Sequence, residues 1–183
     1  MRKIIFIFTV MFSLLSNGQE KNNEFYYDKL KEVEGTDYVI GFHFSRYIVN
    51  DSNFSSLIFI NTKTGKKNQV DFPKDTRVGM PEQIKIDSLN INLIFVRVNS
   101  LEQNANNKSY NINPSQIIIL STDGKTKTQL TDNDFFVKHL TYNKNTGTMV
   151  VSGYYDKNKN NKFDEQDNSD IILYNLKTLK RIN

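Results

Sequence analysis

The chain contains no cysteine, and this absence sets the first limits on what the protein can be. Disulfide bonds are excluded, and so is the lipid anchor that exported lipoproteins carry on a cysteine. Histidine is scarce as well: His43 and His139 stand far apart, and no Asp or Glu lies near them at ligand spacing. The sequence therefore gives no zinc signature, and we expect structural or surface roles for both histidines.

The motifs of several enzyme classes are also missing. No Gly-x-Ser-x-Gly is present, so a serine hydrolase of that type has no support. A phosphate-binding loop needs a glycine five residues before Gly124, where Ile119 stands. Carboxylates are scattered, and no pair of glycosidase acids can be located. Whether the protein is an enzyme stays open at this point, and the motifs favour a protein that is not one.

A long apolar run is absent except at the start of the chain. An apolar stretch over residues 4–15 follows two basic residues and precedes the small residues Ser16-Asn17-Gly18. This order predicts a signal peptide over residues 1–18, and the stretch is shorter than the about 20 residues of a membrane span. We therefore expect one domain over residues 19–183 that is exported, periplasmic or secreted, soluble, and without a membrane span.

Positive charge is only slightly in excess. The formal net charge is +4, and half of it lies on Arg2 and Lys3 of the predicted signal peptide. No dense basic stripe with interleaved aromatic residues remains, so a nucleic-acid partner is not expected.

Short apolar runs alternate with turn clusters along the rest of the chain. Only Asn23–Val33 has the spacing of a helix. Runs rich in Ile, Val, Phe and Tyr predict strands, and the expected fold class is all-β. These runs are Tyr38–Phe44, Leu57–Ile60, Leu93–Val98, Ile117–Leu120, Met149–Tyr155 and Ile171–Leu176.

Three of these runs open similar segments, which are residues 57–66, 117–125 and 171–180. Each segment is an apolar strand, a polar turn and a second strand, and further strands precede it. Each unit thus offers about four antiparallel strands, which is the pattern of a propeller blade.

The units resemble the blades of exported TolB-like β-propeller repeat proteins over roughly residues 36–183. The resemblance implies a propeller-like array of about three four-stranded antiparallel blades. Propellers usually have at least four blades. A small ring completed by residues 19–37, an open array, and a β-sandwich or meander therefore all stay open.

An up-and-down blade sends alternate connections to opposite ends of its strands. We therefore expect the long connections to share one end, and the short lysine-bearing turns to share the other. Function usually resides on the longer loops. The long connections are Asn50–Ser56, Asn99–Gln116 and Asp156–Asp170, and the short turns are Lys63–Lys67, Asp123–Lys127 and Lys177–Arg181.

The residues from Asp156 to Asp167 place oxygen-bearing side chains at loop positions 1, 3, 5, 9 and 12. Calcium takes 6–8 oxygen ligands, and this spacing can supply them. The spacing predicts calcium as the cofactor, with an affinity on the order of 10⁻⁴ to 10⁻³ M. The alternative is a solvated loop without an ion. The predicted ligands are the side chains of Asp156, Asn158, Asn160, Asp164 and Asp167 and the backbone carbonyl of Lys162.

This loop resembles the dockerin and EF-hand type of calcium loop, which often ends in Asp outside the cell. The flanking segments are predicted strands rather than helices, so we expect the loop to be inserted in a β-hairpin. Position 6 is Asn161, a residue that tolerates the left-handed backbone which this position needs.

These observations lead to one main hypothesis of function. It is an exported, non-catalytic, calcium-binding propeller-like module that binds a protein, peptide or glycan on its long-loop face. The alternatives are a small exported carbohydrate-active hydrolase or lyase, and a structural envelope protein. Tyr110, Tyr154 and Tyr155 are candidates for sugar stacking, although packing is favoured for them.

Overall fold

The computed structural model describes residues 27–43, 56–73, 76–103, 110–160 and 164–182. These residues contain no α-helix, and their one helical element is the short 3₁₀ turn Asp87–Leu89. The expected all-β class is confirmed. The predicted signal peptide lies outside the described residues. Within the described part, no helix is both long and apolar enough to cross a membrane.

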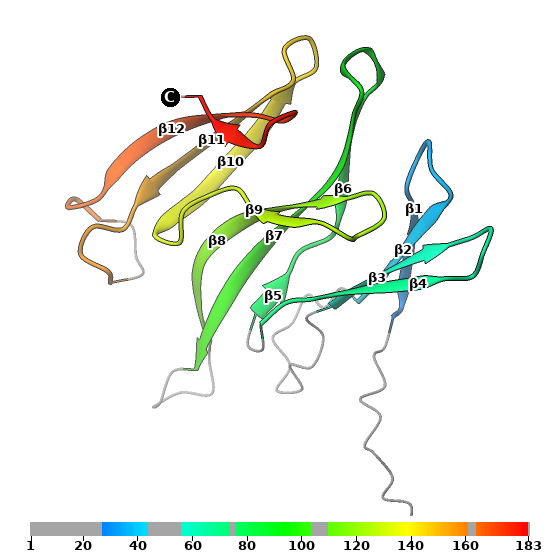
Figure 1. The fold of residues 1–183 in the computed structure, drawn as a ribbon. Coiled ribbons are helices and arrows are strands. Elements are labelled where there is room, and N and C mark those ends of the chain that lie inside the picture. Colours follow the sequence, from blue (N-terminus) through cyan, green and yellow to red (C-terminus); the bar gives the residue numbers. More distant parts are fainter. Residues whose placement is uncertain (1–26, 44–55, 74–75, 104–109, 161–163, 183) are drawn as a thin grey trace, which may run out of the picture.

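The described strands form three antiparallel sheets, which follow one another along the chain (Figure 1). The first sheet holds β1 (Lys29–Glu32), β2 (Tyr38–Phe42), β3 (Ser56–Asn61) and β4 (Lys67–Asp71). The central sheet holds β5 (Thr76–Val78), β6 (Glu82–Ile86), β7 (Ile91–Gln103), β8 (Tyr110–Ser121) and β9 (Lys127–Gln129). The last sheet holds β10 (Phe135–Asn143), β11 (Thr148–Tyr155), β12 (Asn168–Asn175) and β13 (Lys180–Arg181).

The fifth strand of the central sheet does not add a fifth position. Both β5 and β6 pair with β7, one after the other along its length. Between them the backbone N–H of Gly79 still donates to the carbonyl of Arg97 at 2.7 Å, and Pro81 has no N–H to offer. Each sheet therefore has four strand positions, in the order of the sequence.

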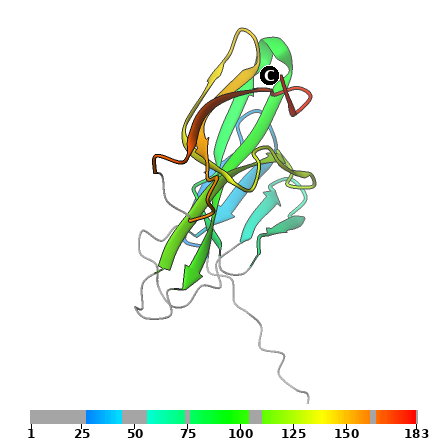
Figure 2. The same cartoon turned by 90° about the vertical axis from the view of Figure 1, so that its left-hand side faces the viewer.

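The central sheet lies between the other two (Figures 1 and 2). Apolar side chains cover both of its faces. In β8 the side chains of Ile117 and Ile119 point toward the last sheet, whereas Ile118 and Leu120 point toward the first. Successive residues of a strand face opposite sides, so a run of four apolar residues serves two cores at once.

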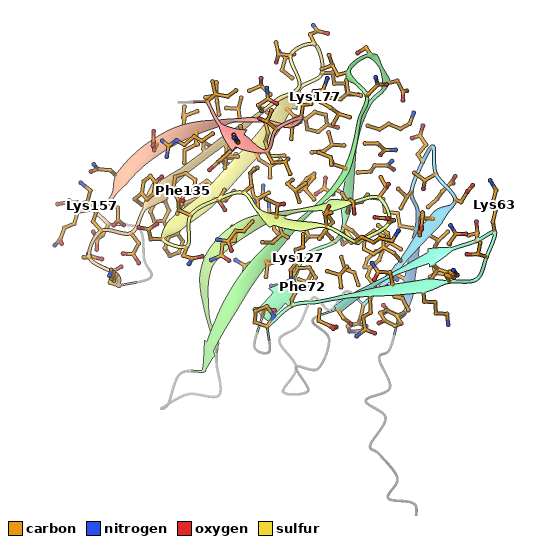
Figure 3. All side chains as sticks on the ribbon, viewed as in Figure 1. Lys63, Phe72, Lys127, Phe135, Lys157 and Lys177 are labelled. Atoms are coloured by element: carbon orange, nitrogen blue, oxygen red, sulfur yellow. The ribbon has the colours of Figure 1, made fainter. Side chains whose placement is uncertain are left out.

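The two cores are distinct. The core between the first and central sheets contains Val33, Ile40, Phe42, Leu57, Phe59, Val70, Phe72, Ile94, Val96, Val98, Ile118 and Leu120. The core between the central and last sheets includes Ile84, Ile86, Phe95, Ile117, Ile119, Leu130, Phe135, Val137, Met149, Val151, Ile172, Tyr174 and Leu176. At the rim of the first core, the Lys127 ammonium lies 5.1 Å from the centre of the Phe72 ring (Figure 3).

The three similar segments recognised in the sequence hold the same place in each sheet. Their apolar runs lie in β3, β8 and β12, the third strand of each sheet, and the turn that follows leads to the fourth. The turns end on a left-handed residue, which is Gly65 (φ 71°), Gly124 (φ 71°) and Leu179 (φ 56°). Leucine thus adopts the conformation that glycine supplies in the other two turns.

Two sequence-based predictions are wrong in the described residues. The segment Asn23–Val33 is not a helix where it is described, because Lys29–Glu32 forms an edge strand paired with β2. The loop expected over Asn99–Gln116 is shorter, because β7 continues to Gln103 and β8 already begins at Tyr110. In both places main-chain pairing overrides a polar or helix-like side-chain pattern.

The meander order separates the connections into two sets. The connections β2–β3, β7–β8 and β11–β12 leave one end of the strands, and the turns β3–β4, β8–β9 and β12–β13 leave the other (Figure 1). Lys63 and Lys177 lie on two of these short turns (Figure 3). Residues 44–55, 104–109 and 161–163 of the longer connections lie outside the described part.

Candidate metal centre

The predicted calcium loop joins β11 to β12, and the strand register fixes its two ends. Tyr155 pairs with Asn168, so Asp156 and Asp167 come next to each other where the hairpin opens. These are positions 1 and 12 of the loop, which a closed ligand shell must bring together. The expected insertion of the loop between two strands is therefore what the described residues show.

Asp156 is anchored to the body of the last sheet. Its backbone N–H donates to the carbonyl of Asp134, just before β10, at 3.1 Å. The residue is only 6% exposed. A buried carboxylate is costly without compensating partners, and its Oδ1 accepts a hydrogen bond from the backbone N–H of Asn160 at 3.1 Å.

Asp167 ties the two legs of the loop together. Its Oδ1 accepts from the backbone N–H of Lys157 at 3.2 Å, and its Oδ2 accepts from that of Asp164 at 2.9 Å. The backbone N–H of Asp167 donates in turn to the carbonyl of Asp164 at 3.2 Å. The carboxylate at position 12 thus faces the interior of the loop.

Asp164 gathers the two asparagines. Its Oδ2 accepts from the side-chain amides of Asn158 at 2.9 Å and Asn160 at 2.6 Å, and its Oδ1 accepts from the backbone N–H of Gln166 at 2.8 Å. Hydrogen bonds from the Gln166 backbone, then Asn158 and Asn160, lower the pKa of this carboxyl against a smaller opposing effect of desolvation. Asp164 therefore stays ionised into the acid range.

The turn at the loop tip directs its lysines outward. Lys159 has a left-handed backbone, with φ 56°, and lies between Asn158 and Asn160. Both Lys157 and Lys159 are exposed, and Lys157 extends from the edge of the molecule (Figure 3). Their charges dilute the negative field of the loop without entering it.

Five of the six predicted ligand residues therefore share one hydrogen-bond network, and the sixth, Lys162, lies outside the described residues. Asn161, the residue expected at the sharp turn, lies outside them too. No group of three or more His, Cys, Asp or Glu side chains among the described residues is close enough to hold a metal ion. Asn160 links the carboxylates of Asp156 and Asp164, whereas the carboxylate of Asp167 accepts from the backbone N–H groups of Lys157 and Asp164.

The donor chemistry of the network nevertheless suits a hard cation. Asn158 and Asn160 direct amide N–H groups at Asp164, and each amide carries an oxygen on the same carbon. Rotation about Cβ–Cγ exchanges nitrogen for oxygen and would turn two donors into two ligands. A cation drives this rotation because it repels N–H groups and attracts oxygen. The residues present thus fit calcium once both amides rotate.

Tyr154 is a neighbour of this loop with a role that the sequence did not show. It is 4% exposed, and its ring stacks on Phe136 with centroids 4.7 Å apart. Burial, and then the negative charges of Asp167 and Asp156, raise the pKa of its hydroxyl. The alternation of β11 separates Tyr154 and Tyr155 onto opposite faces, so packing and not sugar stacking fits Tyr154.

Tyr155 belongs to a second polar cluster, at the rim of the core between the central and last sheets. Its hydroxyl donates to Asp132 Oδ2 at 3.0 Å and accepts from Arg181 at 3.2 Å, while Arg181 also lies 3.5 Å from Asp170. Nearby, burial is the main cause that raises the pKa of Tyr174 to about 12. These groups come from four separate segments, so no local motif could have revealed them.

The two histidines do not meet. His43 follows β2 in the first sheet and lies 3.2 Å from the carboxylate of Asp28, whereas His139 is exposed on β10 of the last sheet. They belong to different sheets with the central sheet between them, which agrees with the absence of a zinc pattern in the sequence.

An open hollow of about 720 Å³ lies beside the loop, on the outer face of the last sheet. It is lined by Lys138, Ser152, Gly153, Tyr154, Ser169, Asp170 and Ile171. Asp170 is the one carboxylate among these lining residues. Glycoside hydrolysis normally uses two carboxyl groups, so this hollow lacks that pair.

Comparison with known proteins adds no relative. No family model, no curated protein and no solved structure matches the chain.

Proposed function

We propose that the chain is an exported, calcium-binding, propeller-like module that binds a protein, peptide or glycan where its long connections gather. The propeller-like arrangement is supported by three four-position meanders that pack face to face. The last strand of each leads by a short connection to the first strand of the next. TolB-like blades have this order.

One observation carries the calcium part of the proposal. The side chains at positions 1, 3, 5, 9 and 12 of a twelve-residue loop all enter one hydrogen-bond network at the mouth of a hairpin. Three of the five are carboxylates, which repel one another unless positive charge offsets them. A bound divalent ion offsets that repulsion and pins the loop. We assign the ion a structural role.

The hollow beside the β11–β12 loop favours a binding function over a hydrolytic one. Its one carboxylate, Asp170, lies 3.5 Å from the guanidinium of Arg181 and is exposed only in part. Glycoside hydrolysis normally uses two carboxyl groups, and the residues that line this hollow supply only this one. The alternative of a carbohydrate-active hydrolase or lyase thus gains no support from this part of the surface.

Isothermal titration calorimetry with calcium chloride tests the proposal. We expect one site per chain with a dissociation constant on the order of 10⁻⁴ to 10⁻³ M. Asp156→Asn replaces a carboxylate ligand with a neutral amide oxygen, which removes one charge from the ligand set, and should abolish measurable uptake. Glu165→Gln is the matched control, because it removes one charge from an exposed loop position outside the ligand pattern.

Equal loss of affinity in both variants would mean that calcium senses only the net charge of the loop, and no uptake at millimolar calcium would contradict the site. The partner is tested by affinity capture from envelope extract in calcium and in chelator. We expect a partner that is retained in calcium alone and is not retained by Asp156→Asn.

A further inference from the structure

The third strands of the three sheets have the same apolar pattern but not the same surroundings. Leu57–Ile60 in β3, Ile117–Leu120 in β8 and Ile171–Tyr174 in β12 are runs of four apolar residues. An antiparallel strand with one wet face normally alternates apolar and polar residues, whereas a continuous run indicates burial on both faces. Of these three strands, β8 alone has a described sheet packed on each of its faces.

The outer side of the last sheet corresponds, by position in the strand, to the side of the first and central sheets that packs against the next sheet. Counting back from the turns at Asn61, Ser121 and Asn175, Ile171 corresponds to Leu57 and Ile117. Those two residues are 1% and 0% exposed, because each faces the next sheet in the stack. Ile171 faces the same way and is 55% exposed.

The outer side of the first sheet corresponds to the side of the central and last sheets that packs against the preceding sheet. Ile58 corresponds to Ile118, 7% exposed, and Ile172, 0% exposed, each of which faces the preceding sheet. In the first sheet no preceding sheet is described. Ile58 is half-buried there, and its neighbour across Gly41 is Leu30, which is 70% exposed.

The stack thus has two end faces. The first end face is the outer side of the first sheet, with Leu30, Val39, Ile58 and Ile60. The last end face is the outer side of the last sheet, with Phe136, Val150, Ile171, Leu173 and Ile182. Of the four large apolar side chains that are exposed in the described residues, Leu30, Ile171 and Ile182 lie on these faces.

Shape and charge on the two end faces are complementary. Leu30 projects from the first end face with the exposed carboxylate of Glu32 beside it on the same side of β1. The last end face has the open hollow, lined by Ile171 and by Lys138, whose ammonium lies 5.0 Å from the centre of the Tyr154 ring.

Other charged side chains on each end face add to this difference in charge. Asp28 and Asp71 also lie on the first end face, together with one lysine, Lys67, whereas the last end face adds Lys180. Asp170 also lines the hollow, and the guanidinium of Arg181 offsets its charge at 3.5 Å. The face with the apolar knob therefore has an excess of carboxylates, and the face with the hollow has an excess of basic side chains.

We propose that the first end face of one copy of this chain packs against the last end face of a second copy. The contact repeats the way in which the sheets pack within the chain, with Leu30 entering the hollow beside Ile171 and Glu32 approaching Lys138. The surfaces differ, so the contact is heterologous. It gives a closed ring if the rotation between copies closes, and an open chain if it does not.

Sedimentation velocity tests the proposal over a range from micromolar to millimolar protein, in calcium and in chelator. We expect species of at least twice the monomer mass at the upper end of the range. Leu30→Asp and Ile171→Asp each replace an exposed side chain, so the fold should persist, and each should weaken assembly at least about tenfold. Met80→Asp is the control, because Met80 is 54% exposed outside both end faces and should assemble normally.

Mixing separates this contact from a symmetric one. Leu30→Asp leaves the last end face intact, and Ile171→Asp leaves the first intact, so an equimolar mixture should form the heterodimer that neither variant forms with itself. Glu32→Lys and Lys138→Glu should each weaken assembly, and the double variant should recover it.

Three results would overturn the proposal. A chain that stays monomeric over the whole range would show that the end faces are covered within one copy. Loss of assembly in only one of the two aspartate variants would indicate a symmetric contact. A mixture that stays monomeric would show that the two faces do not bind each other.

Discussion

The short turns and the acidic loop lie at opposite ends of the same strands, and they satisfy their polar groups in different ways. In the turn after β3, the side-chain oxygen of Asn61 accepts from the backbone N–H groups of Lys63 and Thr64 at 3.1 and 2.9 Å. The turn after β12 repeats this with Asn175. In these two of the three short turns, one neutral oxygen closes the turn and leaves no charge to compensate.

The loop between β11 and β12 uses carboxylates where those turns use an amide. Asp156, Asp164 and Asp167 accept from backbone N–H groups in much the same manner, but each also adds a negative charge. The comparison teaches that a local hydrogen-bond pattern is enough to close a short turn. A longer loop closed by carboxylates also needs a positive charge, and we infer that calcium supplies it.

The largest expected difference between the two regions is their response to calcium. Saturation to a hundredfold excess over the dissociation constant stabilises the folded state by about 2.7 kcal/mol when the ion binds that state alone. Thermal melts in calcium and in chelator should show this gain in the parent chain. Asp156→Ala should remove this gain. An unchanged calcium response in that variant would show that the stabilisation does not come from calcium bound in this loop.

A turn variant should have a smaller effect that is independent of calcium. Gly65 has φ 71°, and a Cβ atom added there would meet no other atom within 4 Å. Gly65→Ala therefore reports the cost of a left-handed alanine alone, about 1 kcal/mol of unfolding free energy. Urea unfolding in calcium and in chelator measures it, and a cost that depended on calcium would break the distinction between the two regions.

The smallest effect concerns pH and the turn after β8. Desolvation is the largest single influence on Asp123 and raises its pKa. Hydrogen bonds from the Ser121 hydroxyl and from the side chain and backbone of Lys125 outweigh it and lower the pKa to about 2. A lowered pKa in the folded state gives stability that is present above the ordinary value and is lost as the pH falls toward 2.

Asp123→Asn removes this titration. Its unfolding free energy should decline less than that of the parent chain between pH 4 and pH 2. Urea unfolding along this pH range measures the difference. Parallel declines in the two proteins would show that Asp123 contributes nothing to the acid response.

Much of the fold could be predicted from the chain because its strands depend on side-chain pattern. Three strands and the turns after them could be predicted without knowledge of the neighbouring sheets. They are β3, β8 and β12, which have continuous apolar runs. The edge strand β1 could not be predicted, because all four of its residues are exposed and only pairing with β2 defines it. The length of the β7–β8 hairpin was missed for the same reason, since main-chain hydrogen bonds extend through a polar segment.

The candidate site could also be predicted only in part from the sequence. The spacing of Asp156, Asn158, Asn160, Asp164 and Asp167 is local, and the described loop brings all five into one network. The anchor of Asp156 on the carbonyl of Asp134 and the position of Tyr154 depend on the pairing of β10 with β11. That pairing bulges between Val137 and His139, a shift that the alternation of residues did not reveal.

The most direct test of the calcium proposal uses Tyr154 as an internal reporter. Its hydroxyl senses the charges of Asp156 and Asp167, so a lanthanide in the loop would lie close enough to receive excitation from its ring. Terbium should gain tyrosine-sensitised luminescence on titration into the protein, calcium should reverse the gain, and Asp156→Asn should not show it. Luminescence that calcium cannot displace, or that persists in Asp156→Asn, would contradict a calcium site in this loop.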